Sequence, residues 1–68
     1  MRIRDTSTNE IWKRISEFEW VTADWNCDGD VYPLYGARFK SEEDGSIQWI
    51  EKNWISNDSS NYFEIIER

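Results

Sequence analysis

Histidine is absent from this chain of 68 residues, and cysteine occurs only once, as Cys27. Histidine is the commonest general base and the commonest metal ligand, so its absence argues against the usual catalytic sites. A single cysteine forms no intramolecular disulfide and is typical of a reducing compartment. Because the neighbours of Cys27 are acidic, which disfavours a thiolate, we expect no catalysis by this residue.

Long apolar runs are also missing. No stretch approaches the ~20 residues needed to cross a bilayer, and residues 1–5 lack the apolar core of a signal peptide. We therefore expect a cytoplasmic protein without membrane contact. Basic residues are in the minority, with 8 Lys and Arg against 14 Asp and Glu and a net charge of -6. Phosphate contacts need clustered basic residues, so we expect no direct binding to nucleic acid.

The length allows one domain, residues 1–68, with a small core. A domain of this size buries only about 60% of its unfolded surface. Five Trp, three Tyr and three Phe compensate, since each buries roughly 150–250 Å². The small size and the lack of a nucleophile paired with a base indicate that the chain is not an enzyme. Surplus tryptophan leaves a homodimer open as an alternative to a monomer.

The clearest structural signal is a β-hairpin over residues 35–50. Asp44-Gly45 lies between two runs of alternating apolar and polar residues, and glycine accepts the positive φ that such a turn needs. We expect Phe39, Trp49 and Phe63 to be core residues. The side chains predicted to face inward across the hairpin are Tyr35, Ala37, Phe39, Ile47 and Trp49.

Residues 8–18 fit two structures. Polar residues recur at helical spacing from Glu10, with apolar residues on the opposite face, and this pattern alone favours a helix. Frequent β-branched and aromatic residues favour a bent strand instead. Residues 18–23 are expected to be extended in either case. A first strand at 1–5, a helical turn at 51–55 that places Trp54 under the sheet, and a last strand at 62–66 complete the prediction.

Short strands separated by turn signals predict a mainly β fold, a small barrel of about five strands. The alternative is an α+β fold in which one helix at 8–18 packs on a four-stranded antiparallel sheet. Segments 1–5, 8–12, 35–40, 47–54 and 62–67, in this order, resemble the small SH3-like β-barrel proteins encoded by bacteriophages and prophages. The resemblance covers most of the chain. It implies a strand rather than a helix in 8–18, and protein binding rather than catalysis.

The sharpest local motif matches the front half of an EF-hand calcium loop. The ligands that it predicts are Asp24, Asn26, Asp28 and Asp30. Tyr35 stands where the bidentate glutamate of such a loop belongs, and Pro33 stops an exiting helix. A calcium site and a plain polar turn both stay open. We predict no other cofactor.

Acidic residues gather in two places, because residues 15–37 contain no Lys or Arg and the hairpin turn adds three more acids. Spaced carboxylates imitate the phosphates of nucleic acid and attract the basic groove of another protein, although an acidic surface also simply keeps a domain soluble. Trp25 is the tryptophan expected to be exposed as an interface anchor. The predicted partner surface consists of Glu17, Glu19, Asp24, Trp25, Asp28, Asp30, Glu42, Glu43 and Asp44.

These observations predict a non-enzymatic, acidic protein-binding module. Its expected partner is a host protein, a nucleic-acid-processing or defence enzyme that the module inhibits by mimicry of nucleic acid, in keeping with the phage resemblance. The alternative is a calcium- or peptide-binding adaptor of the SH3-like kind. In that adaptor, aromatic rings and carboxylates hold a methylated lysine or a proline-rich peptide.

Overall fold

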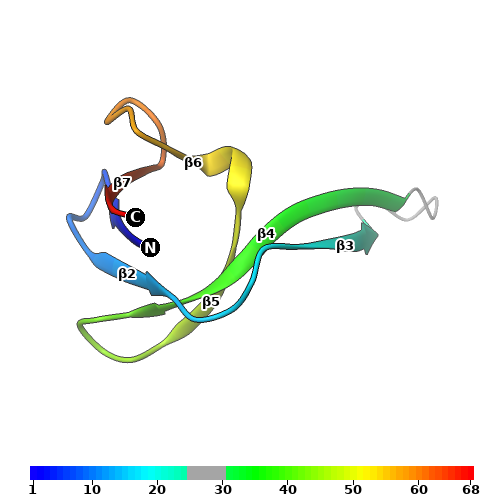
Figure 1. Ribbon diagram of the computed structural model, residues 1–68, viewed down its shortest axis with the longest axis horizontal. Helices are drawn as coiled ribbons and strands as arrows, with labels where there is room; N and C mark the ends of the chain where they lie inside the picture. Colours follow the sequence, from blue (N-terminus) through cyan, green and yellow to red (C-terminus); the bar gives the residue numbers. More distant parts are fainter. Residues whose placement is uncertain (25–30) are drawn as a thin grey trace.

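A computed structural model describes residues 1–24 and 31–68 of the chain (Figure 1). Within these residues, the strands form one curled, barrel-like sheet in the order β3-β4-β2-β1-β7-β6, with β5 paired to β4. The fold is therefore mainly β, as predicted. The described residues contain no helix long enough to span a membrane. The elements are β1 (Arg2–Asp5), β2 (Ile11–Arg14), β3 (Glu19–Asp24), β4 (Val31–Ser41), β5 (Ile47–Glu51), the 3-10 helix η1 (Lys52–Trp54), β6 (Ile55–Ser56) and β7 (Phe63–Glu67).

The helical alternative for residues 8–18 is wrong, and with it the α+β fold, because β2 occupies residues 11–14 and the rest of this stretch is not helical. Trp12 of β2 is buried and pairs with Ile3 of β1 on one side and with Ser41 of β4 on the other. Pairing on both sides satisfies the backbone of β2 and places Trp12 in the core, which outweighs the helical spacing of the polar residues. Asn9, with a φ of 65°, ends the turn that leads into β2.

The hairpin of β4 and β5 is confirmed, but the face that β5 turns inward is the opposite of the predicted one. The register pairs Ala37 with Ile50, which are both buried, and this leaves Ile47 57% exposed on the other face. A shift of one residue exchanges the two faces of a strand. Trp49 lies on the outer face over Gly36, where the missing side chain leaves room for the indole ring.

The core collects side chains from six strands. Phe39 of β4 is completely buried and Phe63 of β7 is also buried, both as predicted. Trp54 is 43% exposed, so the prediction that it lies under the sheet is wrong. The buried hydrophobic set is Ile3, Trp12, Ala37, Phe39, Ile50, Ile55 and Phe63.

β3 and residues 31–36 of β4 form a two-stranded ribbon, which we call the arm. β3 pairs with β4 over its whole length, and the two strands extend together away from the rest of the sheet (Figure 1). A row of aromatic contacts joins the arm to the core. Between ring centroids, Trp20 lies 5.0 Å from Tyr35, Tyr35 lies 5.7 Å from Phe18, and Phe18 lies 6.4 Å from Phe39.

Truncation of the central core residue should unfold most of the molecules. Phe39→Ala removes a fully buried ring, and such substitutions lower the free energy of unfolding by about 3–5 kcal/mol. A domain of this size rarely has more than ~3–5 kcal/mol of stability. Urea unfolding followed by Trp fluorescence measures the change. Ile47→Ala, on the exposed face of the same hairpin, is the control and should change stability by less than about 1 kcal/mol.

Gly36→Ala should also destabilise the fold, although alanine is a small residue. A Cβ at this position would overlap the carbonyl oxygen of Ile50 and lie 2.7 Å from the indole ring of Trp49. Because one obstacle is backbone, relief needs a shift of the ladder between β4 and β5, and overpacking of this kind costs about 1–3 kcal/mol. Thermal unfolding checks the prediction, and a melting temperature equal to that of the unaltered chain would contradict it.

Candidate functional site

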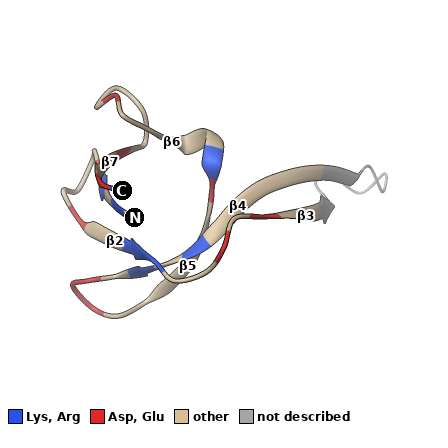
Figure 2. Cartoon of the chain, viewed as in Figure 1, with Lys and Arg blue, Asp and Glu red and all other residues tan. Residues whose placement is uncertain are grey.

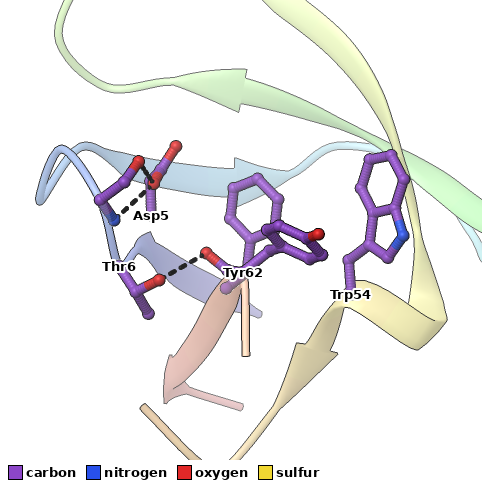
Figure 3. A pocket seen from close by; sticks show the side chains of 6 residues that line it. Asp5, Thr6, Trp54 and Tyr62 are labelled. Carbon is purple, nitrogen blue, oxygen red and sulfur yellow. Dashed lines mark hydrogen bonds between the residues drawn. The ribbon is translucent and has the colours of Figure 1, made fainter. Parts of the chain in front are cut away.

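A pocket of about 390 Å³ opens between the end of β1 and the segment that joins η1 to β7 (Figure 3). Two of its aromatic residues are open to solvent, since Trp54 is 43% exposed and Tyr62 is 67% exposed. Phe63 is buried in the core and forms the floor. We call this the Trp54–Tyr62 pocket. Its lining residues are Asp5, Thr6, Ser7, Trp54, Tyr62 and Phe63.

The register between β6 and β7 brings the two exposed rings together. Ile55 and Phe63 pair in parallel, and both side chains are buried. Trp54, the last residue of η1, and Tyr62, the residue before β7, stand directly before this pair, and both are exposed. Their ring centroids lie 5.7 Å apart and their planes meet at 58°. The rings therefore form a V-shaped corner of aromatic faces.

Hydrogen bonds hold the backbone under Tyr62. The N–H group of Thr6 donates to the carbonyl oxygen of Tyr62 at 3.1 Å, and the Thr6 hydroxyl donates to the carbonyl oxygen of Asn61 at 2.8 Å. The Asn61 side-chain amide donates in turn to the carbonyl oxygen of Asn53, in η1, at 3.1 Å. The two segments that bear the rings are thus tied to β1 and to each other. A site ordered before binding loses less entropy when a ligand arrives.

Asp5 adds a negative charge to the pocket. Its Oδ1 accepts hydrogen bonds from the backbone N–H of Ser7 at 2.9 Å and from the Ser7 hydroxyl at 2.7 Å (Figure 3). Burial raises the pKa of Asp5, but hydrogen bonds from Ser7 and Thr8 outweigh this effect and hold the pKa below its usual range. The carboxylate is therefore ionised at neutral pH. Aromatic faces beside a fixed carboxylate suit a cation.

The acidic residues predicted to face a partner fall in separate parts of the sheet. Glu17, two residues before β3, and Glu19, its first residue, are exposed, and Asp24 ends that strand. Figure 2 shows the acidic turn between β4 and β5 well apart from β3. The described acids on this surface therefore form two groups rather than one. Trp25, Asn26, Asp28 and Asp30 lie outside the described residues, so the Trp25 anchor and the calcium loop stay predictions.

The turn between β4 and β5 is less negative than its composition suggests. Glu42, Glu43 and Asp44 are exposed there, but Glu42 accepts hydrogen bonds from Arg2 at 2.7 Å and 3.0 Å. The hydrogen bonds from Arg2 lower the pKa of Glu42, so this carboxylate is ionised and paired. Among residues 1–24 and 31–68, no group of three or more metal-binding side chains could hold an ion.

Sequence reasoning missed the pocket. The sequence predicts Trp54 under the sheet, Tyr62 at the start of the last strand and Asp5 at the end of the first strand, and it does not bring the three together. A usable signal is the repeated pair of an aromatic and an apolar residue, Trp54-Ile55 and Tyr62-Phe63. In each pair the second residue is buried and the first is exposed. That the two pairs lie side by side follows only from the pairing of β6 with β7.

Comparison with known proteins finds no family model, no curated protein and no solved structure that matches this chain. What the chain binds is therefore inferred from the chemistry of its own surfaces.

Proposed function

We propose that the chain is a non-enzymatic protein-binding module that holds a cationic side chain of a partner protein in the Trp54–Tyr62 pocket. The observation that carries this proposal is the corner formed by two exposed aromatic rings next to ionised Asp5. A cation over an aromatic ring gains about 0.5–2 kcal/mol, with more when the site excludes water. The negative charge of the Asp5 carboxylate also attracts the cation.

A methylated lysine or an arginine fits this chemistry better than a proline does. Proline also packs on aromatic grooves, but it makes no use of the charge on Asp5. The net charge of -6 favours approach of a basic partner over long distances. One side chain in a pocket of this kind gives only part of the affinity, and neighbouring contacts of the partner supply the rest.

The identity of the partner protein is a separate prediction. Exposed Glu17 and Glu19 support electrostatic attraction of a basic protein. A host nucleic-acid-processing or defence enzyme, inhibited through mimicry of nucleic acid, is one such protein. Calcium binding and homodimer formation also stay predictions.

Removal of either ring should weaken binding of a cation. The probe is N-acetyl-trimethyllysine methyl ester, compared with the neutral isostere in which carbon replaces the ammonium nitrogen. We expect a saturable shift of the Trp54 indole N–H signal in ¹H–¹⁵N spectra with the cation only. Tyr62→Ala should weaken binding about fivefold, which corresponds to ~1 kcal/mol for one cation–ring contact. Trp54→Ala, followed through backbone amide signals, should do the same.

The matched control for this experiment is Trp20→Ala, which removes another exposed tryptophan from a different part of the sheet. It should leave the affinity for the trimethyllysine probe unchanged. Equal binding of the neutral isostere would show that the pocket recognises shape without charge. Undiminished affinity in both Trp54→Ala and Tyr62→Ala would place the cation elsewhere.

The affinity for the cation should depend on pH only in the acid range. The pKa of Asp5 lies below its ordinary value of 3.8, so its charge stays constant from pH 7 down to about that value and is lost only below it. We therefore expect constant affinity from neutral pH to the ordinary pKa and a decrease in more acidic solution. Asp5→Asn should bind more weakly at neutral pH and should not show this decrease. A midpoint near neutral pH in the unaltered chain would contradict the role of Asp5.

A further inference from the structure

β3 presents the longest unpaired edge among the described strands. Within the described residues it pairs only with β4, on one side. The other strands at the ends of the sheet are β5, with five residues, and β6, with two, against six for β3. An unpaired edge exposes a row of backbone N–H and C=O groups that another strand can complete.

The two sides of the arm are not equivalent. Among residues 1–24 and 31–68, residues 31–35 of β4 also pair only with β3, but Pro33 interrupts that side, because proline has no N–H group to donate. β3 contains neither proline nor lysine, and its register with β4 runs without a bulge. Trp20, Val21 and Thr22 favour extended structure. The edge of β3 is therefore left open for pairing, whereas the edge of β4 is blocked.

The acidic residues at the two ends of β3 favour one kind of added strand over another. Glu19 begins the strand and Asp24 ends it, and no Lys or Arg occurs in residues 15–37. If a second copy of the chain paired antiparallel with β3 in full register, Glu19 would lie opposite Asp24 at both ends. Like charges directly opposite each other destabilise a sheet. A strand with Lys or Arg at its two ends meets opposite charges at the same positions.

Trp20 provides an anchor beside this edge. Its side chain is 69% exposed, yet its ring packs 5.0 Å from the ring of Tyr35, which is stacked in turn on Phe18. The ring is thus supported from within the sheet while much of its surface remains open. An added strand would cover that surface, and cross-strand pairs with an aromatic ring stabilise a sheet by roughly 0.2–1 kcal/mol each.

We propose that the edge of β3 accepts an extended segment of a basic partner protein as an additional strand. The segment has β-branched or apolar residues at its centre and Lys or Arg at both ends. Backbone hydrogen bonds to β3 supply affinity, and the terminal charges supply selectivity. This surface is separate from the Trp54–Tyr62 pocket and does not depend on it.

Two capped peptides that differ only in their terminal charges test the proposal. One is acetyl-Lys-Val-Thr-Val-Thr-Lys-amide, and the other carries Glu in place of both Lys residues. In ¹H–¹⁵N spectra at low salt, the Lys peptide should shift the amide signals of β3 and slow their hydrogen exchange. The Glu peptide should bind about tenfold more weakly, as expected for two charge pairs of ~0.5–1 kcal/mol each. High salt should reduce the difference.

Three variants make the test specific. Glu19→Lys combined with Asp24→Lys should reverse the preference, so that the Glu peptide binds more tightly. Thr22→Lys places a charge in the middle of the edge, as natural proteins do to block pairing, and should abolish binding of both peptides. Thr22 is exposed, so this variant should keep its fold, which circular dichroism and thermal unfolding check. Trp54→Ala should bind the Lys peptide like the unaltered chain.

Several results would overturn the proposal. One is the absence of binding of the Lys peptide at millimolar concentration by a correctly folded chain. Equal affinity for the two peptides would remove the role of the terminal charges. Signal shifts confined to the Trp54–Tyr62 pocket would place the peptide on that site instead. Finally, a dimer in sedimentation equilibrium that Thr22→Lys dissociates would show that a second copy of the chain covers the edge.

Discussion

The pairing of β4 with three other strands is the constraint on which the whole sheet depends. Residues 31–36 pair with β3, residues 36–40 with β5 and residues 39–41 with β2. Gly36 lies where the arm meets the barrel-like part of the sheet, and its missing side chain lets the ladder and Trp49 approach it closely. From there, Ala37 and Phe39 turn inward and fix the face on which β1, β2, β5, β6 and β7 contribute their core residues. A small domain has few alternatives to such a shared strand, because its core is too limited for a second layer.

The candidate pocket is a consequence of this arrangement at the opposite edge. Ile55 and Phe63 must both be buried to complete the core that Phe39 begins. Trp54 and Tyr62 stand directly before the two buried residues, at the entry to β6 and β7, and both are exposed. The exposure of two large rings is unfavourable for a free domain, although single exposed aromatic residues are common. Here the rings gather in one place and carry a carboxylate beside them, and such a combination is more typical of a binding surface than of random exposure.

Much of the fold could be predicted from the sequence, because its strongest signals are local. The Asp44-Gly45 turn and the alternation before it identify the β4–β5 hairpin, and Gly45 has the positive φ, 77°, that this turn needs. The helical spacing around Glu10 favoured a helix where the structure has a strand. The strand forms because Trp12 is buried between β1 and β4, and such long-range contacts cannot be read from a short stretch of sequence. The prediction of the inward face of β5 was wrong for a similar reason. Both Trp49 and Ile50 are apolar, and only the register between β4 and β5 decides which of the two is buried. The pocket could not be predicted because its lining residues come from three separate stretches of the chain.

The acidic residues of the chain differ in their surroundings. Spread over the whole surface, a net charge of -6 would mainly keep the domain soluble. The described charges are instead divided: Glu42 and Glu64 are paired with Arg2 and Arg4, whereas Asp5 lies in the pocket and Glu19 is exposed at the start of the unpaired edge. Paired carboxylates stabilise the fold and attract partners weakly. Asp5 lines the pocket that holds Trp54 and Tyr62, and Glu19 precedes Trp20, so an acidic residue stands at each of the two places where exposed aromatic rings lie. The two proposed sites therefore call for the same kind of partner, a basic protein, through different contacts, and one partner that engaged both would bind more tightly than either proposed site alone allows.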